Sequence, residues 1–182
     1  MLEVYRLATV VELDYGHNWY RIANALARRL DPIAPVQAAG VIAALSPMMD
    51  WDRNMMLAIR AYEDGEASGA LFGNVRKANA IMAGADPLEI LGGKKVRNFF
   101  AAIANPESEE AVCIDRHAFD IAMGRVTNDK TRGALSRKGV YEEFQDAYRR
   151  AAKVLTKETG VHHTPSEVQA VTWVAWRRLK GE

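Results

Sequence analysis

Lys95 and Asp115 are the residues of this sequence whose types and positions are best suited to covalent chemistry. Lys95 comes shortly after Gly92-Gly93, and Asp115 directly after the apolar run Val112-Cys113-Ile114. A neutral lysine amine can attack an electrophilic carbon and form a Schiff base, and a fixed carboxylate can stabilise positive charge on a substrate. Taken singly, however, Asp115 is more typical of a helix N-cap, and Lys95 of a surface lysine. Their interpretation therefore depends on their surroundings.

Glycines and basic residues surround Lys95. Gly92-Gly93 predicts a tight turn, and the backbone N–H groups of Gly93 and of a helix that starts after it could bind a phosphate. Lys94 and Arg97 add positive charge near the same turn, which would favour a polyanion such as DNA. A plain turn between two helices, carrying solvated cations, explains these residues as well.

Helical periodicity dominates the rest of the chain and predicts the elements that must position these residues. Residues 112–114 are the one strand-like fragment, and residues 127–139 read as a long surface loop. Trp173, Trp176 and Gln169 read as core and packing residues of the last helix. We therefore expect one all-α domain over residues 1–182, with helices over 17–30, 35–45, 51–62, 74–83, 87–91, 94–104, 116–123, 140–159 and from 165 onward.

Four segments, spread over residues 35–125, together resemble one known family. They are Ala43-Ala44-Leu45-Ser46-Pro47 with Asn54 downstream, Lys77-Ala78-x-x-Ile81, Leu88-Glu89-x-Leu91-Gly92-Gly93-Lys94-Lys95-x-x-Asn98, and Ile114-Asp115-Arg116-His117-x-Phe119. In this order they resemble motifs of the helix-hairpin-helix DNA glycosylase superfamily, most closely its endonuclease-III-like branch. The resemblance implies a helix-hairpin-helix glycosylase-like fold and an enzyme that acts on a base extruded from DNA.

The resemblance also implies a role for each candidate residue. Lys95 would be the amine nucleophile and Asp115 the catalytic carboxylate, with no metal and no cofactor. Met48 stands where the family often carries a glutamine that fills the gap left by the extruded base, although a core methionine is the simpler interpretation. Helix capping is the simpler explanation of Asp50, and a structural role is the simpler explanation of His117. The implied DNA contacts are Gly92, Gly93, Lys94, Arg97, Ser46 and Met48, and the implied pocket residues are Asp50, Trp51, Asn54 and His117.

The sequence departs from the family pattern at the hairpin, where Leu91 is followed directly by Gly92-Gly93 instead of proline-glycine-x-glycine. This shorter turn would also suit a related activity. Some phage proteins that resemble the superfamily are thought to attach amines or amino acids to an activated 5-hydroxymethyl group on thymine in DNA. A DNA-binding module without catalysis, and a helical interaction protein that binds no nucleic acid, are the other two alternatives.

Composition limits these alternatives only in part. The net charge of +1 over 182 residues favours the protein without nucleic acid, but five of the basic residues fall between Arg125 and Lys138. The single cysteine, Cys113, excludes an internal disulfide and a four-cysteine metal or iron–sulfur site within one chain. Since no apolar run is long enough to span a bilayer and residues 1–6 lack a secretory-signal layout, we expect a cytoplasmic protein with no membrane partner. The oligomeric state is not indicated.

Overall fold

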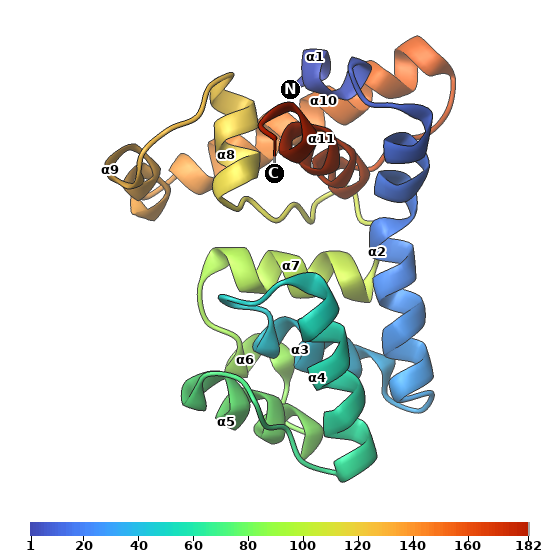
Figure 1. Ribbon diagram of the computed structural model, residues 1–182, viewed down its shortest axis with the longest axis vertical. Coiled ribbons are helices and arrows are strands. Elements are labelled where there is room, and N and C mark those ends of the chain that lie inside the picture. Colours follow the sequence, from blue (N-terminus) through green and yellow to red (C-terminus); the bar gives the residue numbers. More distant parts are fainter. Residues whose placement is uncertain (182) are drawn as a thin grey trace. The chain divides into compact units, whose positions relative to one another are not determined.

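The regular structure is helical throughout residues 1–181, the part of the chain that a computed structural model describes, which confirms the predicted all-α class (Figure 1). Among these helices, none is long and apolar enough to cross a membrane. The elements are α1 (Leu2–Arg6), α2 (Val10–Leu30), α3 (Pro35–Leu45), α4 (Trp51–Asp64), α5 (Phe72–Met82), α6 (Pro87–Ile90), α7 (Lys94–Ala104), α8 (Arg116–Met123), α9 (Asp129–Arg132), the 3-10 helix η1 (Gly133–Ser136), α10 (Val140–Thr159) and α11 (Pro165–Leu179).

These elements divide into two compact units. Unit 1 combines residues 1–21 with the chain from Pro106 onward, and unit 2 consists of residues 22–105. Helix α2 contributes its first half to unit 1 and its second half to unit 2. Unit 2 is therefore continuous in sequence, whereas unit 1 is assembled from both ends of the chain.

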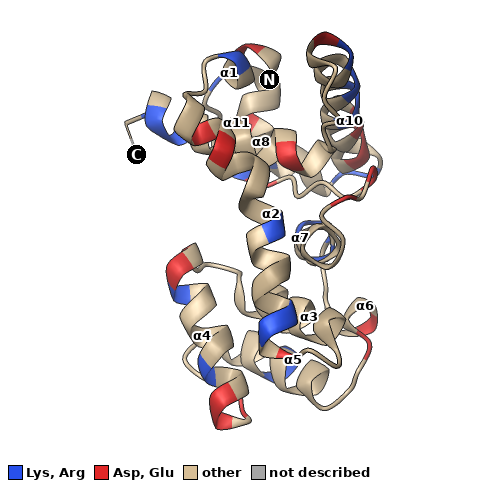
Figure 2. Ribbon diagram, turned by 90° about the vertical axis from the view of Figure 1, so that its right-hand side faces the viewer, with Lys and Arg blue, Asp and Glu red and all other residues tan. Residues whose placement is uncertain are grey.

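In unit 2 the other helices pack around α3. This helix carries no charged residue (Figure 2), and all its residues from Ala38 to Leu45 are buried. Gly40 lets α6 approach closely, since a Cβ there would lie 2.8 Å from the Pro87 Cγ. At the far end of α7, the Asn24 amide donates a hydrogen bond to the Ile103 carbonyl at 2.8 Å. The apolar helix α3 thus supports the α6–α7 pair that carries Lys95.

In unit 1, helices α8, α10 and α11 share a core with residues of α1. Phe119, Tyr148, Leu155 and Val168 are among its buried members. Helix α11 begins with a capping box, in which Thr164 and Glu167 exchange hydrogen bonds. The first half of α2 packs tightly against α11, because a Cβ on Gly16 would lie 2.5 Å from the Val171 Cα.

The start of the chain is more helical than predicted. Helix α2 begins at Val10 rather than at residue 17, and α1 precedes it. A capping box was the missed signal: the Thr9 N–H donates to the Glu12 carboxylate at 2.8 Å, and the Glu12 N–H donates to the Thr9 Oγ1 at 3.3 Å. The Arg178 side chain also binds Glu12, and this hydrogen bond lowers the pKa of Glu12 to about 2.

One further prediction for unit 1 is wrong, and one strand-like segment forms no strand. Residues 112–114 form no strand, because side chains of α10 bind their backbone instead: the Ile114 N–H donates to the Tyr141 hydroxyl at 2.8 Å, and Gln145 donates to the Val112 carbonyl at 3.1 Å. Residues 127–139 are not a plain loop, since they contain α9 and η1. Both segments are shaped by polar contacts to distant residues, which periodicity does not reveal.

Candidate functional site

Asp115 is held by two hydrogen bonds at the start of α8. Its Oδ1 accepts from the Ala118 N–H at 2.7 Å, which is the predicted N-cap bond. Its Oδ2 accepts from the indole N–H of Trp173 on α11 at 3.1 Å. The two bonds fix the orientation of the carboxylate, and the residue as a whole is half-buried. Capping requires only one of these oxygens, and the second bond is therefore additional to it.

Trp173 connects Asp115 to two more polar residues. The ring of the buried His117 meets the indole edge-on, with centroids 6.0 Å apart, and Arg177 lies 4.8 Å from the centre of the Trp173 ring. His117 also accepts a hydrogen bond from the Arg116 Nε at 3.2 Å. Trp173 is expected from the sequence to be a core residue, whereas it is half-buried and binds the candidate carboxylate. Residues four positions apart on a helix are neighbours on its surface, so the spacing of Trp173 and Arg177 indicates that their side chains can meet.

Two buried tyrosines lie close enough to sense the Asp115 charge. Burial raises the pKa of Tyr148, with a smaller contribution from Asp115, and burial likewise raises the pKa of Tyr20, where Cys113 and Asp115 add to the effect. Tyr148 uses its hydroxyl to donate to the Ala118 carbonyl at 3.1 Å, and Tyr20 donates to Gln169 at 2.9 Å. Both phenols therefore remain neutral and serve as structural hydrogen-bond donors around the start of α8.

In unit 2 the hairpin that carries Lys95 consists of α6, a three-residue turn and α7. Gly93 has φ +73°, a conformation that favours glycine, and a Cβ there would meet no atom within 4 Å. Arg97 folds back and donates from Nε to the Leu91 carbonyl at 2.7 Å, which braces the turn. The first turn of α7 contains no acidic residue, and Lys94 and Lys95 are exposed there. Cations in this position oppose the usual preference for acidic residues at helix starts.

Lys77 brings a third lysine amine to the hairpin. Its Nζ lies 3.8 Å from the position that a Cβ on Gly92 would occupy, and the residue is half-buried on α5. In the sequence, Lys77 stands out only as part of the Lys77-Ala78-x-x-Ile81 motif. Its pairing with Gly92 depends on how α5 packs near the turn, which the spacing along the chain does not reveal.

The segment between α3 and α4 presents an exposed methionine. The Met48 side chain is 93% exposed, and its backbone φ is +63°. Among residues 1–181, every other residue with positive φ is a glycine. The alternative of a core methionine is therefore wrong. Ser46, the C-cap of α3, uses its hydroxyl to donate to the Ala43 carbonyl at 2.9 Å. A strained backbone that holds an apolar side chain in solvent is typical of functional positions.

The remaining candidates on α4 differ in accessibility. Asp50 is exposed and caps α4 through the Arg53 N–H at 2.9 Å, and Trp51 is half-buried. Asn54 is only 1% exposed, and its Oδ1 is buried without a hydrogen-bond partner. Capping therefore accounts for Asp50, and Asn54 lies in the interior of unit 2 instead of on an open surface.

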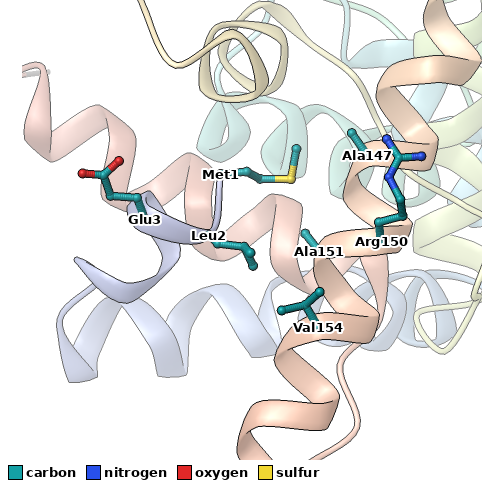
Figure 3. A pocket seen from close by; sticks show the side chains of 7 residues that line it. All are labelled: Met1, Leu2, Glu3, Ala147, Arg150, Ala151 and Val154. Carbon is teal, nitrogen blue, oxygen red and sulfur yellow. The ribbon is translucent and has the colours of Figure 1, made fainter.

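The structure groups the candidates by unit. Asp115 and His117 lie in unit 1, together with Trp173, while the residues at 46–54 and 92–97 lie in unit 2. Unit 1 also has a shallow, mainly apolar pocket, with Glu3 and Arg150 on opposite sides of it (Figure 3), but no candidate residue lines it. Within residues 1–181, no group of three or more His, Cys, Asp or Glu is arranged to hold a metal ion.

Comparison with known proteins gives one match. The profile of a family described as a family of unknown function (DUF7178) matches residues 1–180. No curated protein and no solved structure matches the chain.

Proposed function

The chain belongs to this family of unknown function, DUF7178, and we propose that it is a DNA base-processing enzyme, a glycosylase and lyase that acts on a modified pyrimidine rotated out of the duplex. In this proposal Asp115 supplies a catalytic carboxylate and Lys95 an amine nucleophile. The sequence resemblance to helix-hairpin-helix glycosylases suggests these roles. The two hydrogen bonds of Asp115 are the observation that carries the proposal, and they bear on the role of the carboxylate.

Asp115 is better fixed than a capping residue needs to be. The Ala118 N–H and the Trp173 indole each bind one oxygen, at 2.7 and 3.1 Å, and the residue is only half-buried. Breaking an N-glycosidic bond develops positive charge on the deoxyribose. A carboxylate that is already oriented stabilises this charge without further reorganisation. This is the chemical task that the geometry of Asp115 suits.

Two features of unit 2 support DNA as the substrate. The open turn at Gly93 leads into a helix whose first turn carries Lys94 and Lys95 and no acid, which suits a phosphate. Met48 holds an apolar side chain in solvent on a strained backbone. An apolar side chain of this kind can enter a base stack and occupy the space of an extruded nucleotide. The cations at the start of α7 and the positive φ of Met48 both lower the stability of the free protein, and both are useful when DNA is bound.

The proposed reaction uses the amine in its neutral form. The Lys95 Nζ forms a bond to C1′ of the nucleotide while the C1′–N bond breaks, and the base leaves with that electron pair and takes up a proton. Loss of a proton from the nitrogen and opening of the sugar ring give a Schiff base between Lys95 and C1′. This intermediate is a covalent protein–DNA link that borohydride reduces to a stable amine.

Borohydride trapping tests the role of Lys95. We expect wild-type protein to form an adduct with DNA that contains an abasic or modified pyrimidine site, and Lys95→Ala to form none. Lys94→Ala is the matched control, because it removes the neighbouring amine and should still form the adduct. An adduct that persists in Lys95→Ala and disappears in Lys77→Ala would transfer the nucleophile to Lys77.

Asp115→Asn tests the carboxylate. Asparagine caps helices as well as aspartate does, so the bond from the Ala118 N–H is retained, while the charge and the acceptor of the Trp173 indole are lost. We expect the rate of base release to fall roughly a hundredfold or more, by analogy with the loss of other electrostatic groups at active sites. An unchanged rate would remove Asp115 from the mechanism.

A base-modifying transferase is the second candidate, favoured by the short hairpin. Only Leu91, Gly92 and Gly93 separate α6 from α7, and the Lys77 amine adjoins this turn. A transferase would join an amine to a 5-hydroxymethyl-pyrimidine that carries a phosphate-based leaving group, and would keep the glycosidic bond. Mass spectrometry of nucleosides, after incubation with such DNA and amino acids, would detect the heavier base. Salt-dependent DNA binding without either product would indicate a non-catalytic module.

A further inference from the structure

Residues 125–138, here called the basic arm, hold most of the excess positive charge of the chain. They contain five Lys or Arg and one Asp, a net charge of +4 in a chain whose net charge is +1, so the remaining residues together carry −3. The arm contains α9 and η1, which lie in unit 1 beside the start of α10 (Figure 1). The near-neutral total therefore conceals a strongly basic segment.

The arm is anchored through a buried aspartate of α8. Asp120 is fully buried and accepts hydrogen bonds from the backbone and side chain of Thr127 and from Arg132, whose Nη2 lies 2.7 Å from the Asp120 Oδ2. Burial raises the pKa of Asp120, but the hydrogen bonds from Arg132 and Thr127 lower it by more, so this carboxyl remains charged. Leu135 packs against the core of unit 1. The arm is thus fixed at three points.

The other four cations of the arm point to solvent. Arg125, Lys130, Arg137 and Lys138 are exposed, and none of their side chains forms an ion pair within residues 1–181. The acid of the arm, Asp129, is 3.1 Å from Arg132 and so is already paired. Glu142 and Glu143 follow in the first turn of α10, where acidic residues suit the helix dipole. The arm therefore presents four cations with no acid of its own to neutralise them.

The composition of the arm indicates which kind of polyanion it would bind. Binding to a lipid surface would require several apolar side chains that insert into it. Within the arm, Val126 is the single large apolar residue that is exposed. Single-stranded nucleic acid is bound largely by stacking of bases on aromatic rings, and the arm contains no aromatic residue. Phosphates of a duplex require only cations in fixed positions. A rigid arm also binds them without the entropic cost of ordering a loop.

We infer that the basic arm is a second DNA-contact surface, which binds the phosphate backbone of duplex DNA independently of sequence. This inference rests on the proposed function for its choice of partner. It assigns to unit 1 a DNA contact separate from the hairpin of unit 2, and it makes Asp120 and Arg132 the anchor of that contact. The four exposed cations each neutralise backbone charge and release counterions.

Salt-dependent binding tests the inference. Fluorescence anisotropy with a labelled duplex, measured between about 50 and 200 mM salt, gives the slope of log K against log salt concentration. We expect Lys130→Ala/Lys138→Ala to reduce this slope by about 2 and to weaken binding on all sequences alike. The matched control is Lys153→Ala/Lys157→Ala, which removes two exposed lysines of α10 outside the arm and should leave the slope unchanged.

Three results would overturn the inference: no duplex binding by the wild-type protein, a slope that Lys130→Ala/Lys138→Ala leaves unchanged, or tighter binding of single-stranded DNA or RNA than of duplex. The hairpin variant Lys94→Ala/Lys95→Ala separates this inference from the proposed enzyme. If the arm variant binds like wild type while the hairpin variant loses adduct formation, the arm fails and the enzyme stands. If the arm variant alters the slope but wild type forms no product, the arm stands and the enzyme fails.

Discussion

Unit 2 and unit 1 are both helical, but different forces organise them. Unit 2 is built around α3, an uncharged helix whose buried residues pack against its neighbours through apolar contacts. Unit 1 has an apolar core as well, but it also depends on polar pairs such as Asp120 with Arg132 and Asp115 with Trp173, which lie 12 and 58 residues apart. Burial of apolar area is non-directional and tolerant, whereas a buried polar group is costly as soon as it loses its partner. We therefore expect unit 1 to be the more sensitive unit to single polar substitutions.

The largest effect should come from Asp120→Ala in unit 1. This change removes the partner of Arg132 and the acceptor of both hydrogen bonds from Thr127. We expect unit 1 to lose about 3 kcal/mol of stability. This value is at the lower end of the range for a broken buried ion pair, because Arg132 is partly exposed. Chemical denaturation would measure the loss. Hydrogen exchange of peptides from each unit should show faster exchange in residues 125–139, with unit 2 unchanged. Equal loosening of both units would contradict the comparison.

The same carboxyl predicts an acid dependence confined to unit 1. Because the folded-state pKa of Asp120 lies below its ordinary value, its contribution to stability is complete above the ordinary aspartate pKa of about 3.9 and is lost as pH falls through the folded value. Asp120→Asn should flatten the fall in stability at acidic pH relative to wild type. Thermal unfolding at a series of pH values would measure this, and parallel curves for the two proteins would contradict it.

Gly16→Ala should destabilise unit 1 by about 2–3 kcal/mol, since the new Cβ would meet the Val171 backbone at 2.5 Å and one helix must shift. Gly40→Ala is the counterpart in unit 2 and should cost about 1–2 kcal/mol, because its closest atoms belong to the Pro87 ring instead of a backbone. The control is Gly73→Ala on α5, where no atom lies within 4 Å and the change should be neutral or slightly stabilising. Denaturation midpoints would rank the three variants.

Tyr141→Phe should cost about 1–3 kcal/mol, the penalty for leaving the buried Ile114 N–H without an acceptor. Tyr15→Phe is the control, since that tyrosine is exposed on α2 and should tolerate the loss of its hydroxyl. Equal stability of the two variants would show that the Tyr141 hydroxyl is not needed to hold residues 112–114 in place.

The smallest effect, and one of opposite sign, is expected in unit 2. Met48→Gly relieves a backbone with φ +63° and should stabilise the protein by about 0.5–1 kcal/mol. If Met48 enters the base stack, the same change should weaken binding to duplex that contains an abasic site. Calorimetry and anisotropy measure the two effects, and a destabilised Met48→Gly protein would show that the methionine side chain stabilises the fold.

Much of unit 2 could be predicted from the sequence, because its helices follow local patterns. Less of unit 1 could be predicted, because tertiary contacts shape several of its segments. The bounds of α3 and α7, the Asp86 cap of α6 and the αL glycine after α4 follow from periodicity and local caps. The α9–η1 segment and the course of residues 112–114 do not, because Asp120 and Tyr141 determine them through tertiary contacts. At the candidate site, the cap role of Asp115 was predictable from its position. Its bond to Trp173, which lies 58 residues away in sequence, was not.

The division of α2 between the units has a consequence for synthesis on the ribosome. Residues 22–105 emerge as one uninterrupted stretch, so unit 2 has all its parts before translation ends. Residues 1–21 are made before unit 2, yet Glu12, Gly16 and Tyr20 find their partners on α11, which is made after it. Residues 1–21 must therefore remain without these partners, and accessible to chaperones, until α11 leaves the exit tunnel.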